Sequence, residues 1–299
     1  MKSIDEIDEI KVVTWNVNGI RSRVFNNKTS AEIPKNKSLL LQKNSAMHNL
    51  IENTNADIIC LQETRCSHEF SKFAILENYN SYFNNSKLTG ARGPNRYSGT
   101  AIYTKYIPNK IEYQIPGYTD LEGRIIILHY NRFIIINVYV PNSGSNYDNR
   151  IHFNNAFLNY FKTINSPIIF CGDMNMAINT YFDKNKVKEM PGIYKHELKF
   201  HADITCTNIY GEMFKDTLDC VNDLTIYTWW NPLSKKIFNF ETNLMIGQQR
   251  KLNKGWRLDY IYTRGFTNGK SQVLKNIGEE SDPQASDHAP VFGILTLDK

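Results

Sequence analysis

The sequence predicts an α/β protein built from two packed β-sheets with helices on the outside. Strand-like segments are dense along the 299 residues and outnumber the helical ones. Several of these segments are apolar throughout, which is typical of sheets covered on both faces. Strand-rich halves joined by few helices favour two sheets that face each other.

The expected strands are short and mostly β-branched or aromatic, as strand propensity requires. In chain order they are Lys11–Asn16, Asp57–Gln62, Thr100–Lys105, Arg124–Tyr130, Phe133–Val140, Pro167–Gly172, Asp259–Arg264 and Pro290–Leu297.

Two segments have the apolar spacing of amphipathic helices, Leu39–Asn53 and Ile151–Thr163. Asp148 or Asn149 is expected to cap the start of the second helix. Polar composition predicts surface loops or insertions at Val24–Ser38, Asn84–Tyr97 and Asn231–Gly255.

Polar motifs that could build one site occur from residue 14 to residue 290, so the site needs both ends of the chain. We therefore expect one domain over residues 1–299, with residues 1–10 as a flexible N-terminus.

Composition is that of a globular protein, with 41% hydrophobic and 22% charged residues. The formal charge of +5 is compatible with a nucleic-acid partner and does not demand one. The N-terminus has no apolar signal segment, and no stretch approaches the roughly 20 apolar residues of a membrane helix. The five cysteines form no Cys-x-x-Cys pair, which argues against a zinc site or a disulfide framework. We expect a soluble intracellular protein that does not contact membranes.

Carboxylates and an amide at the ends of apolar runs are candidates for a hard divalent cation. Mg²⁺ takes one or two protein carboxylates and keeps several waters. Glu63 ends one apolar run, Asp287 precedes another, and Asn18 adds an amide oxygen. Taken alone, Glu63 is more typical of a solvated loop residue than of a metal ligand.

Asp173 and Asn175 follow a third apolar run and are two residues apart. On an extended segment both side chains would point the same way. One could then hold or deprotonate a water while the other donates hydrogen bonds to an oxyanion. The alternative is an Asx turn after a buried strand, which Gly172 favours.

His288 is the candidate donor of a proton or hydrogen bond to a phosphate oxygen. Its other ring nitrogen needs an orienting carboxylate, for which Asp259 is the candidate. The alternatives are a structural histidine and an ion pair between Asp259 and Arg257. A zinc-protease helix at residues 196–201 is rejected, because His196 and His201 are five residues apart instead of four.

These motifs resemble the exonuclease/endonuclease/phosphatase superfamily, and within it the exodeoxyribonuclease III family of apurinic/apyrimidinic (AP) endonucleases. The resemblance runs from Val12 to about Leu297. The shared motifs are Leu61-Gln62-Glu63, Gly172-Asp173-Met174-Asn175 and Ser286-Asp287-His288, and the more selective ones are Asn16-Val17-Asn18-Gly19-Ile20-Arg21, Glu122-Gly123-Arg124, Tyr139-Val140-Pro141-Asn142-Ser143-Gly144 and Gly255-Trp256-Arg257-Leu258-Asp259-Tyr260.

The resemblance implies a four-layer α/β sandwich of the deoxyribonuclease I type, with two mixed sheets flanked by helices. It implies a DNA base-excision-repair enzyme that hydrolyses the phosphodiester 5′ to an abasic site and leaves a 3′-hydroxyl. A 3′-phosphodiesterase and 3′–5′ exonuclease side activity is also implied. The expected cofactor is Mg²⁺, with Mn²⁺ able to substitute, and the expected partner of this monomer is double-stranded DNA that contains abasic sites.

The resemblance also implies residue roles. Glu63 binds the metal with help from Asn18 and Asp287. Asp173, held by Asn16, positions or deprotonates the attacking water. Asn175 contacts the nucleophile or the pentacovalent transition state, and Tyr139 and Asn142 contact the scissile phosphate. His288, oriented by Asp259, stabilises the charge that develops on the phosphate.

Several further residues are expected to contact DNA. Arg21 lies in a selective motif, and Trp229, Trp256 and Leu258 match the pocket that accepts a flipped abasic sugar. One indole of the Trp229-Trp230 pair is expected to be core packing.

Residues 231–257 carry six Lys or Arg against one Glu, so this segment is expected along the phosphate backbone with Met245 as a minor-groove wedge. Its expected DNA-contacting cations are Lys235, Lys236, Arg250 and Lys251. A solvated loop is the alternative.

Two other functions stay open at this point. A lipid or inositol phosphate hydrolase would use the same scaffold, although the Trp256–Tyr260 motif and the basic segment argue against it. A catalytically dead DNA-binding module is disfavoured, because every expected ligand is present.

Overall fold

The computed structural model describes residues 4–21, 45–90, 93–94, 97–144, 146–207, 212–218, 223–230, 250, 252–277 and 286–297. Four of the expected DNA-contacting side chains therefore lie outside the described residues: Lys235, Lys236, Met245 and Lys251. The expected loop at 24–38 and the start of the expected helix at 39–44 also lie outside them.

The first sheet has six strands in the order β13-β14-β1-β2-β6-β3. Their bounds are β13 Phe266–Val273, β14 Val291–Leu297, β1 Glu9–Asn16, β2 Ile58–Gln62, β6 Thr100–Thr104 and β3 Asn80–Asn84. β1 and β2 are parallel, and the other neighbours in this sheet are antiparallel.

The second sheet also has six strands, in the order β11-β12-β10-β9-β8-β7. Their bounds are β11 Lys215–Asp216, β12 Asp259–Arg264, β10 Ile168–Asp173, β9 Ile134–Tyr139, β8 Ile125–His129 and β7 Lys110–Glu112. β9 and β10 are parallel, and the other pairs are antiparallel. A small ribbon of β4 (Thr89–Gly90) and β5 (Gly93–Pro94) stands apart from both sheets.

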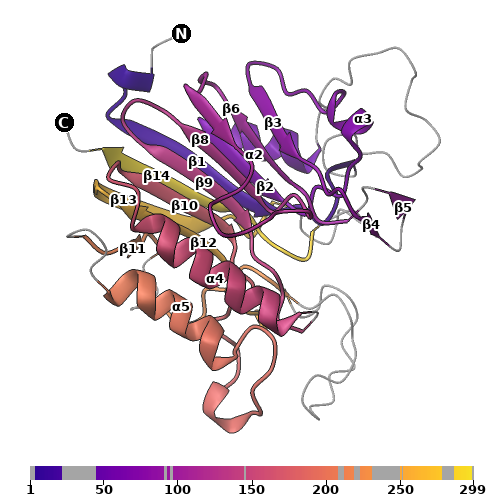
Figure 1. Ribbon diagram of the computed structural model, residues 1–299, viewed down its shortest axis with the longest axis vertical. Coiled ribbons are helices and arrows are strands. Elements are labelled where there is room, and N and C mark those ends of the chain that lie inside the picture. Colours follow the sequence, from indigo (N-terminus) through magenta and orange to yellow (C-terminus); the bar gives the residue numbers. More distant parts are fainter. Residues whose placement is uncertain are drawn as a thin grey trace.

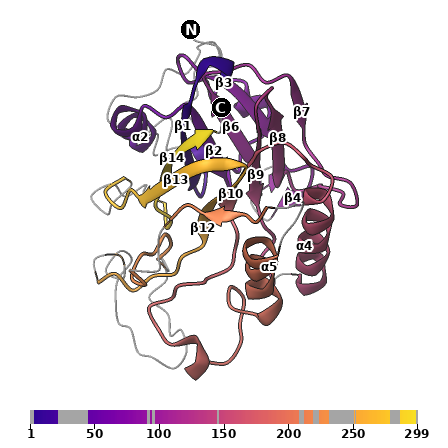
Figure 2. The same cartoon turned by 90° about the vertical axis from the view of Figure 1, so that its left-hand side faces the viewer.

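The helices flank the two sheets on their outer faces. They are α2 (Ala46–Thr54), α3 (His68–Ser71), α4 (Tyr147–Phe161) and α5 (Lys195–Cys206), with 3-10 turns η1 (Ile4–Glu6) and η2 (Lys184–Lys186). Figure 2 shows α2 beside the first sheet and α4 and α5 on the opposite side, beyond the second sheet. The predicted four-layer α/β sandwich is thus confirmed (Figure 1).

Strand alternation explains the layers. In β10, Ile168 and Phe170 pack towards α4 and α5, whereas Ile169 and Cys171 pack between the sheets. β2 alternates in the same way between the inter-sheet layer and the layer under α2. A strand with both faces buried is apolar at every position, which is why these strands were visible in the sequence.

All eight expected strands are present, and their bounds differ from the expectation by no more than two residues. The strands that sequence reasoning missed lie at or near sheet edges and are short or polar. β13, for example, reads Phe-Thr-Asn-Gly-Lys-Ser-Gln-Val and buries only its first residue fully. An edge strand with one solvent-exposed face lacks the continuous apolar run that identifies a central strand.

The helix predictions need three corrections. α4 begins at Tyr147, and its cap is Asn146, whose side chain accepts a hydrogen bond from the Asn149 N–H; neither expected residue caps it. The described part of the first expected helix begins at Ala46, after a Ser45 cap. α5 was not predicted, although it contains the rejected zinc motif at residues 196–201. Its two histidines have separate partners, since His196 contacts Ser143 and His201 contacts Tyr262.

Part of the expected flexible N-terminus has a defined place in the fold. Ile4 in η1 is buried in the inter-sheet layer, and Ile7 packs against the same layer. Among the described residues, no helix is both long enough and apolar enough to span a bilayer.

Candidate active site

The topology brings six strand ends to one edge of the sandwich. The parallel strands β1 and β2 end together, with Asn16 opposite Gln62. The parallel strands β9 and β10 end with Tyr139 opposite Asp173. β12 is antiparallel to β10, so it begins at this edge with Asp259 opposite Asp173.

β14 reaches the same edge because it runs antiparallel to β1. Val291 lies opposite Thr14, so Ser286-Asp287-His288 immediately precedes the strand at the edge where β1 ends. Far-apart segments of the chain therefore converge at one rim, as the motif positions predicted.

A buried acidic-imidazole group lies at the centre of this rim. The Nδ1 atom of His288 lies 2.8 Å from the Oδ2 atom of Asp259, and its Nε2 atom lies 3.9 Å from the Oδ2 atom of Asp173. All three side chains are at least 95% buried. The sequence-based alternative of an Asp259–Arg257 ion pair is wrong, because Arg257 pairs with Asp216 at 2.6 Å.

The protonation of this group follows from its burial. Burial raises the pKa of Asp173 to about 7; the His288 cation opposes this rise, and the Asp259 carboxylate adds to it. Burial alone would lower the pKa of His288, but the carboxylates of Asp259 and Asp173 outweigh it and raise the pKa to about 10. His288 is therefore a cation near neutral pH, and Asp173 can exchange a proton there.

The strand that carries Asp173 turns immediately after it. The Asn175 N–H donates to the Oδ1 atom of Asp173 at 2.9 Å, and Asn175 has a left-handed φ of 45°. The geometry is the Asx turn, so the extended arrangement with both side chains on one face is wrong. Gly172, just before the turn, permits the close approach of β10 to β9, since a Cβ there would lie 1.9 Å from the Val138 carbonyl oxygen.

The Asx turn still leaves Asp173 and Asn175 in the same site. Asn16 donates from Nδ2 to the Oδ2 atom of Asp173 at 2.9 Å. Asn175 donates from Nδ2 to the Val140 carbonyl at 2.8 Å, and its Oδ1 atom accepts from the exposed Asn142 at 3.3 Å. The turn thus places the amide of Asn175 against the loop that follows β9.

Glu63 lies beside this group, in a more open position. Its Oε1 atom accepts from the Tyr139 hydroxyl at 2.8 Å and from Asn16 Nδ2 at 3.1 Å, and its Oε2 atom forms an ion pair with Arg65. The side chain is 14% exposed. Burial and the nearby Glu63 carboxylate raise the pKa of Tyr139 far above its usual range, so Tyr139 keeps its hydroxyl proton.

Asp287 forms the outer part of the site. Its Oδ1 atom accepts from Asn18 Nδ2 at 2.9 Å, and its Oδ2 atom accepts from the Trp229 indole N–H at 3.0 Å. The Asn18 N–H in turn donates to Asn16 Oδ1 at 3.0 Å. Asn16 therefore connects this outer carboxylate to Glu63 and to Asp173.

Three residues of the rim hold a strained backbone. Asn18, Glu63 and Asn175 have φ values of 46°, 51° and 45°, in the left-handed region that non-glycine residues rarely adopt. Backbone of this kind persists only where the surroundings impose it, and it concentrates at functional sites.

Two sets of groups here could hold a metal ion. One ligand atom from each of Asp173, Asp259 and His288 lies within 4.8 Å of the others. However, His288 is held as a cation by its hydrogen bond to Asp259, which disfavours it as a ligand. Glu63, Asp287 and Asn18 offer oxygen atoms near solvent, in carboxylates already oriented by neighbouring donors, which suits Mg²⁺ better.

An aromatic cluster borders the site. Trp256 and Leu258 are 6% and 7% exposed, and they pack with Ala177, Ile193 and the half-buried Trp229. Trp230 is buried in a separate cluster, so one indole of the pair is core packing, as predicted. Three residues expected to line a pocket therefore pack together, beside Asp287.

The other expected DNA-contacting side chains have partners within the protein. Arg21 lies 4.5 Å above the Phe70 ring. Arg250 lies 4.8 Å above the Trp230 ring and donates to the Lys275 carbonyl at 2.6 Å, so its expected contact with the DNA phosphate backbone stays a prediction.

Sequence reasoning missed the buried cation beneath the loops of the site. Arg150 is fully buried and donates to the carbonyls of Pro141 and Asn175 at 2.9 and 3.2 Å. Its charge partner is the fully buried Glu197, 3.8 Å away. An arginine near a helix start gives no local signal that it will be buried.

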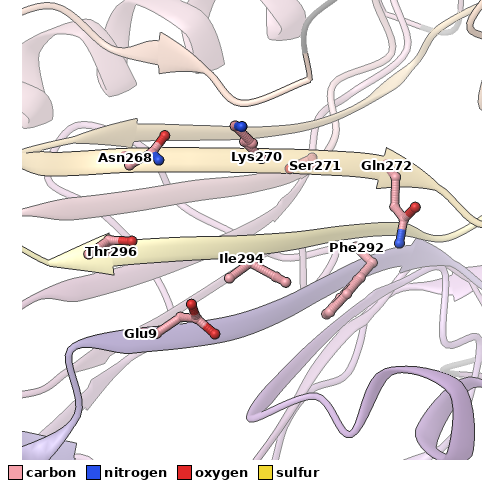
Figure 3. Close-up of a pocket in the computed structure, with 8 residues that line it drawn as sticks. All are labelled: Glu9, Asn268, Lys270, Ser271, Gln272, Phe292, Ile294 and Thr296. Carbon is pink, nitrogen blue, oxygen red and sulfur yellow. The ribbon is translucent and has the colours of Figure 1, made fainter.

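A groove of about 390 Å³ lies outside this site, on the outer face of β13, β14 and β1 (Figure 3). It is lined by Glu9, Asn268, Lys270, Ser271, Gln272, Phe292, Ile294 and Thr296. With one carboxylate and one lysine, it lacks the clustered acid and imidazole groups of the rim.

Two packed mixed sheets with a buried acidic-imidazole group at one rim define the structural class of this protein as an α/β sandwich. The chain matches the model of the Endonuclease/Exonuclease/phosphatase family over residues 13–288. It belongs to this family, as its motifs predicted.

Named relatives agree with the family match. The chain is 30% identical to "Recombination repair protein 1" of Drosophila melanogaster, over 96% of this chain and 37% of that protein. It is 27% identical to a "DNA-(apurinic or apyrimidinic site) endonuclease" of Dictyostelium discoideum, over 99% and 75% of the two chains. It is 28% identical to an "Exodeoxyribonuclease" of Bacillus subtilis, over 96% and 100%.

Solved structures show the same fold. The AP endonuclease LMAP from Leishmania major superposes with a TM-score of 0.69 at 21% identity, covering 99% of this chain and 91% of that one. The predicted nuclease branch of the family is thus confirmed by the curated relatives, and the fold by the solved structure.

Proposed function

We propose that this protein is a Mg²⁺-dependent AP endonuclease of DNA base excision repair. It would hydrolyse the phosphodiester 5′ to an abasic site and leave a 3′-hydroxyl. The observation that carries the proposal is the buried His288–Asp259 pair beside Asp173, at a rim that also holds Glu63 and Asp287. The names of the Dictyostelium and Bacillus relatives support DNA as the substrate.

Proton transfer in this proposal centres on Asp173. Its pKa of about 7 lets it accept a proton from an attacking water at neutral pH. The hydrogen bond from Asn16 holds Oδ2, and the N–H of Asn175 holds Oδ1, so the carboxylate keeps one orientation.

Charge that develops on the phosphate would meet preorganised donors. The His288 cation, held by Asp259, supplies one, and the amide groups of Asn142 and Asn175 supply others. Such donors are already in position before the reaction begins, so they need no reorganisation in the transition state. The hydroxyl of Tyr139 donates to Glu63 in this structure and would turn to the phosphate when Glu63 binds the metal ion.

Glu63, with Asn18 and Asp287, would hold the Mg²⁺ ion, which supplies Lewis-acid charge neutralisation at the phosphate. Mn²⁺ should substitute, because it accepts the same oxygen ligands. Glu63 and Arg65 form an ion pair in this structure, so Arg65 is the natural charge to move aside when a cation binds.

The aromatic cluster would select the abasic nucleotide. Flipping a residue without a base from the duplex costs little, because it has no pairing partner. The half-buried Trp229 would offer an apolar surface to the bare sugar, with the buried Trp256 and Leu258 packed behind it, and Asp287 links Trp229 to the reacting centre. We propose that the protein acts as a monomer, with 3′-phosphodiesterase and 3′–5′ exonuclease side activities.

An incision assay tests the proposal. The substrate is a 5′-labelled duplex with one tetrahydrofuran abasic analogue, and the control is the same duplex with an intact base. We expect one incised product with a 3′-hydroxyl in Mg²⁺, none with EDTA, and much slower cleavage of the intact duplex.

The His288→Ala variant should lose about 10²–10³-fold in rate, as expected for removing one charge-stabilising donor. Equal turnover by His288→Ala and wild type would refute the assigned site. Cleavage of inositol phosphates without cleavage of the abasic duplex would refute the DNA substrate and favour a phosphatase.

A further inference from the structure

Three aromatic rings gather on the surface beside the site and have no role in the proposed reaction. Tyr147, at the start of α4, is 46% exposed. Its ring centre lies 4.3 Å from that of His196 and 5.5 Å from that of Tyr194. Tyr194 and His196 stack on each other, with ring centres 5.6 Å apart at an angle of 22°. These three residues are called the tyrosine-histidine cluster below.

Direct contacts connect this cluster to the rim. The Nε2 atom of His196 lies 3.1 Å from the Oγ atom of Ser143, the residue after Asn142. The Gly144 N–H donates to Asn142 Oδ1 at 2.8 Å. The cluster therefore packs against the loop that presents Asn142 to Asn175.

The same cluster is continuous with the aromatic pocket. The segment before Tyr194 contains Gly192, where an added Cβ would lie 2.6 Å from the Trp256 ring. Ile193 packs with Trp256 and Leu258. One short stretch of chain thus runs from the proposed abasic pocket to the tyrosine-histidine cluster.

Lysines are frequent in the segment that carries Tyr194 and His196. Residues 184–199 hold five lysines against two glutamates. One of these glutamates, Glu197, is buried and faces Arg150, so it offers no charge to solvent. The side chain of Lys195, between Tyr194 and His196, is 92% exposed and forms an exposed ion pair with Glu189 at 3.5 Å.

We propose that the tyrosine-histidine cluster is a stacking surface for an unstacked nucleobase next to the cleaved phosphodiester. Tyr147 is exposed, and Tyr194 and His196 are partly exposed beside Lys195. Aromatic rings with nearby lysines are typical of surfaces that bind unpaired nucleic acid, because any base can stack on a ring. The inference rests on the proposed function, and it specifies which part of the DNA this protein recognises: a flank that is frayed or unpaired, beside the abasic pocket.

The neutral state of His196 supports stacking over simple charge attraction. Burial and the Arg150 cation keep the pKa of His196 below its usual value. The cluster should therefore contribute to affinity through ring contact, and the lysines should carry the dependence on salt.

Fluorescence of 2-aminopurine tests the proposal. Single 2-aminopurines are placed in turn at the positions that flank a tetrahydrofuran site in the duplex. With wild type in EDTA, we expect quenching at one flanking position when the protein binds. Tyr147→Ala should abolish this quenching and weaken binding about 5- to 20-fold, and Tyr147→Phe should retain both.

Two further measurements separate stacking from other effects. The slope of log affinity against log salt should be the same for Tyr147→Ala and wild type, whereas Lys195→Ala should reduce it. The matched control is Tyr106→Ala, which removes a tyrosine beyond β6, at the opposite end of the first sheet from the site.

Two kinds of failure are distinguishable. If Tyr147→Ala keeps wild-type affinity and quenching while incision of the abasic duplex proceeds, the stacking surface is refuted and the proposed function stands. If wild type neither binds nor incises the abasic duplex, the proposed function is refuted, and this inference with it.

Discussion

Two halves of the rim use the same types of side chain in different surroundings. In the inner half, Asp173, Asp259 and His288 are at least 95% buried and lie within a few ångströms of one another. In the outer half, Glu63 and Asp287 are only partly buried and bond to neutral donors or to Arg65.

The difference separates proton chemistry from cation binding. Burial raises the pKa of Asp173, and the neighbouring carboxylates of Asp259 and Asp173 raise the pKa of His288 against the effect of burial. The outer carboxylates keep access to solvent, so a hydrated Mg²⁺ ion can reach them without complete dehydration. A single site can therefore hold both functions, because the protein buries one half and not the other.

The largest expected effect comes from the inner half. Asp173→Asn keeps the size of the side chain but removes the proton acceptor, so the single-turnover incision rate should fall about 10²–10⁴-fold. The Mg²⁺ concentration for half-maximal rate should change little. The control is Asp203→Asn, which breaks an exposed ion pair to Lys199 on α5 and should leave the rate unchanged. A loss under tenfold for Asp173→Asn would show that the inner half is not the proton acceptor.

A smaller effect, of a different kind, is expected from the outer half. Glu63→Gln keeps an acceptor for the Tyr139 hydroxyl but removes a negative charge. The Mg²⁺ concentration for half-maximal rate should rise about 10- to 100-fold, with much of the rate restored at saturating Mg²⁺. Calorimetric titration of Mn²⁺ without DNA measures the same loss independently of activity. If Glu63→Gln binds the metal ion as tightly as wild type, the cation site lies in the inner half instead.

The smallest expected effect is on stability. In EDTA, the raised pKa of Asp173 means that the folded state holds a proton which the unfolded state releases near pH 4. The unfolding free energy of wild type relative to Asp173→Asn should therefore fall by about 1–3 kcal/mol as pH rises from 4 to 7.5.

The His288 contribution has its own pH range. Its raised pKa gives a stabilising charge that is complete below pH 6.5 and is lost as pH rises towards 10. Urea unfolding at several pH values measures both effects. A difference between wild type and Asp173→Asn that does not vary from pH 4 to 7.5 would contradict the burial argument.

Central strands were predictable from sequence because both of their faces are covered. β10 and β2 alternate between two apolar layers, so every position is apolar, and the motif residues begin where the apolar run ends. β13 and α5 were missed because their exposed faces interrupt the apolar pattern, and the cap of α4 was misplaced because several adjacent residues were suitable caps.

Side-chain partners were less predictable than strands. Arg257 stands two residues from Asp259, yet it pairs with Asp216 across β12. Asn175 reaches the site through a turn and not through an extended strand. Arg150 and Glu197 are 47 positions apart and form a buried pair that no local pattern indicates.

The sequence by itself determined the apolar runs, the kinds of polar group at their ends and the family to which the chain belongs. Tertiary structure alone decided which carboxylates are buried away from solvent, which one bonds to His288 and which surface aromatics lie beside the site. The physical reason is that strand formation depends on neighbours in the chain, whereas proton affinity depends on neighbours in space, here contributed by β10, β12 and the segment before β14.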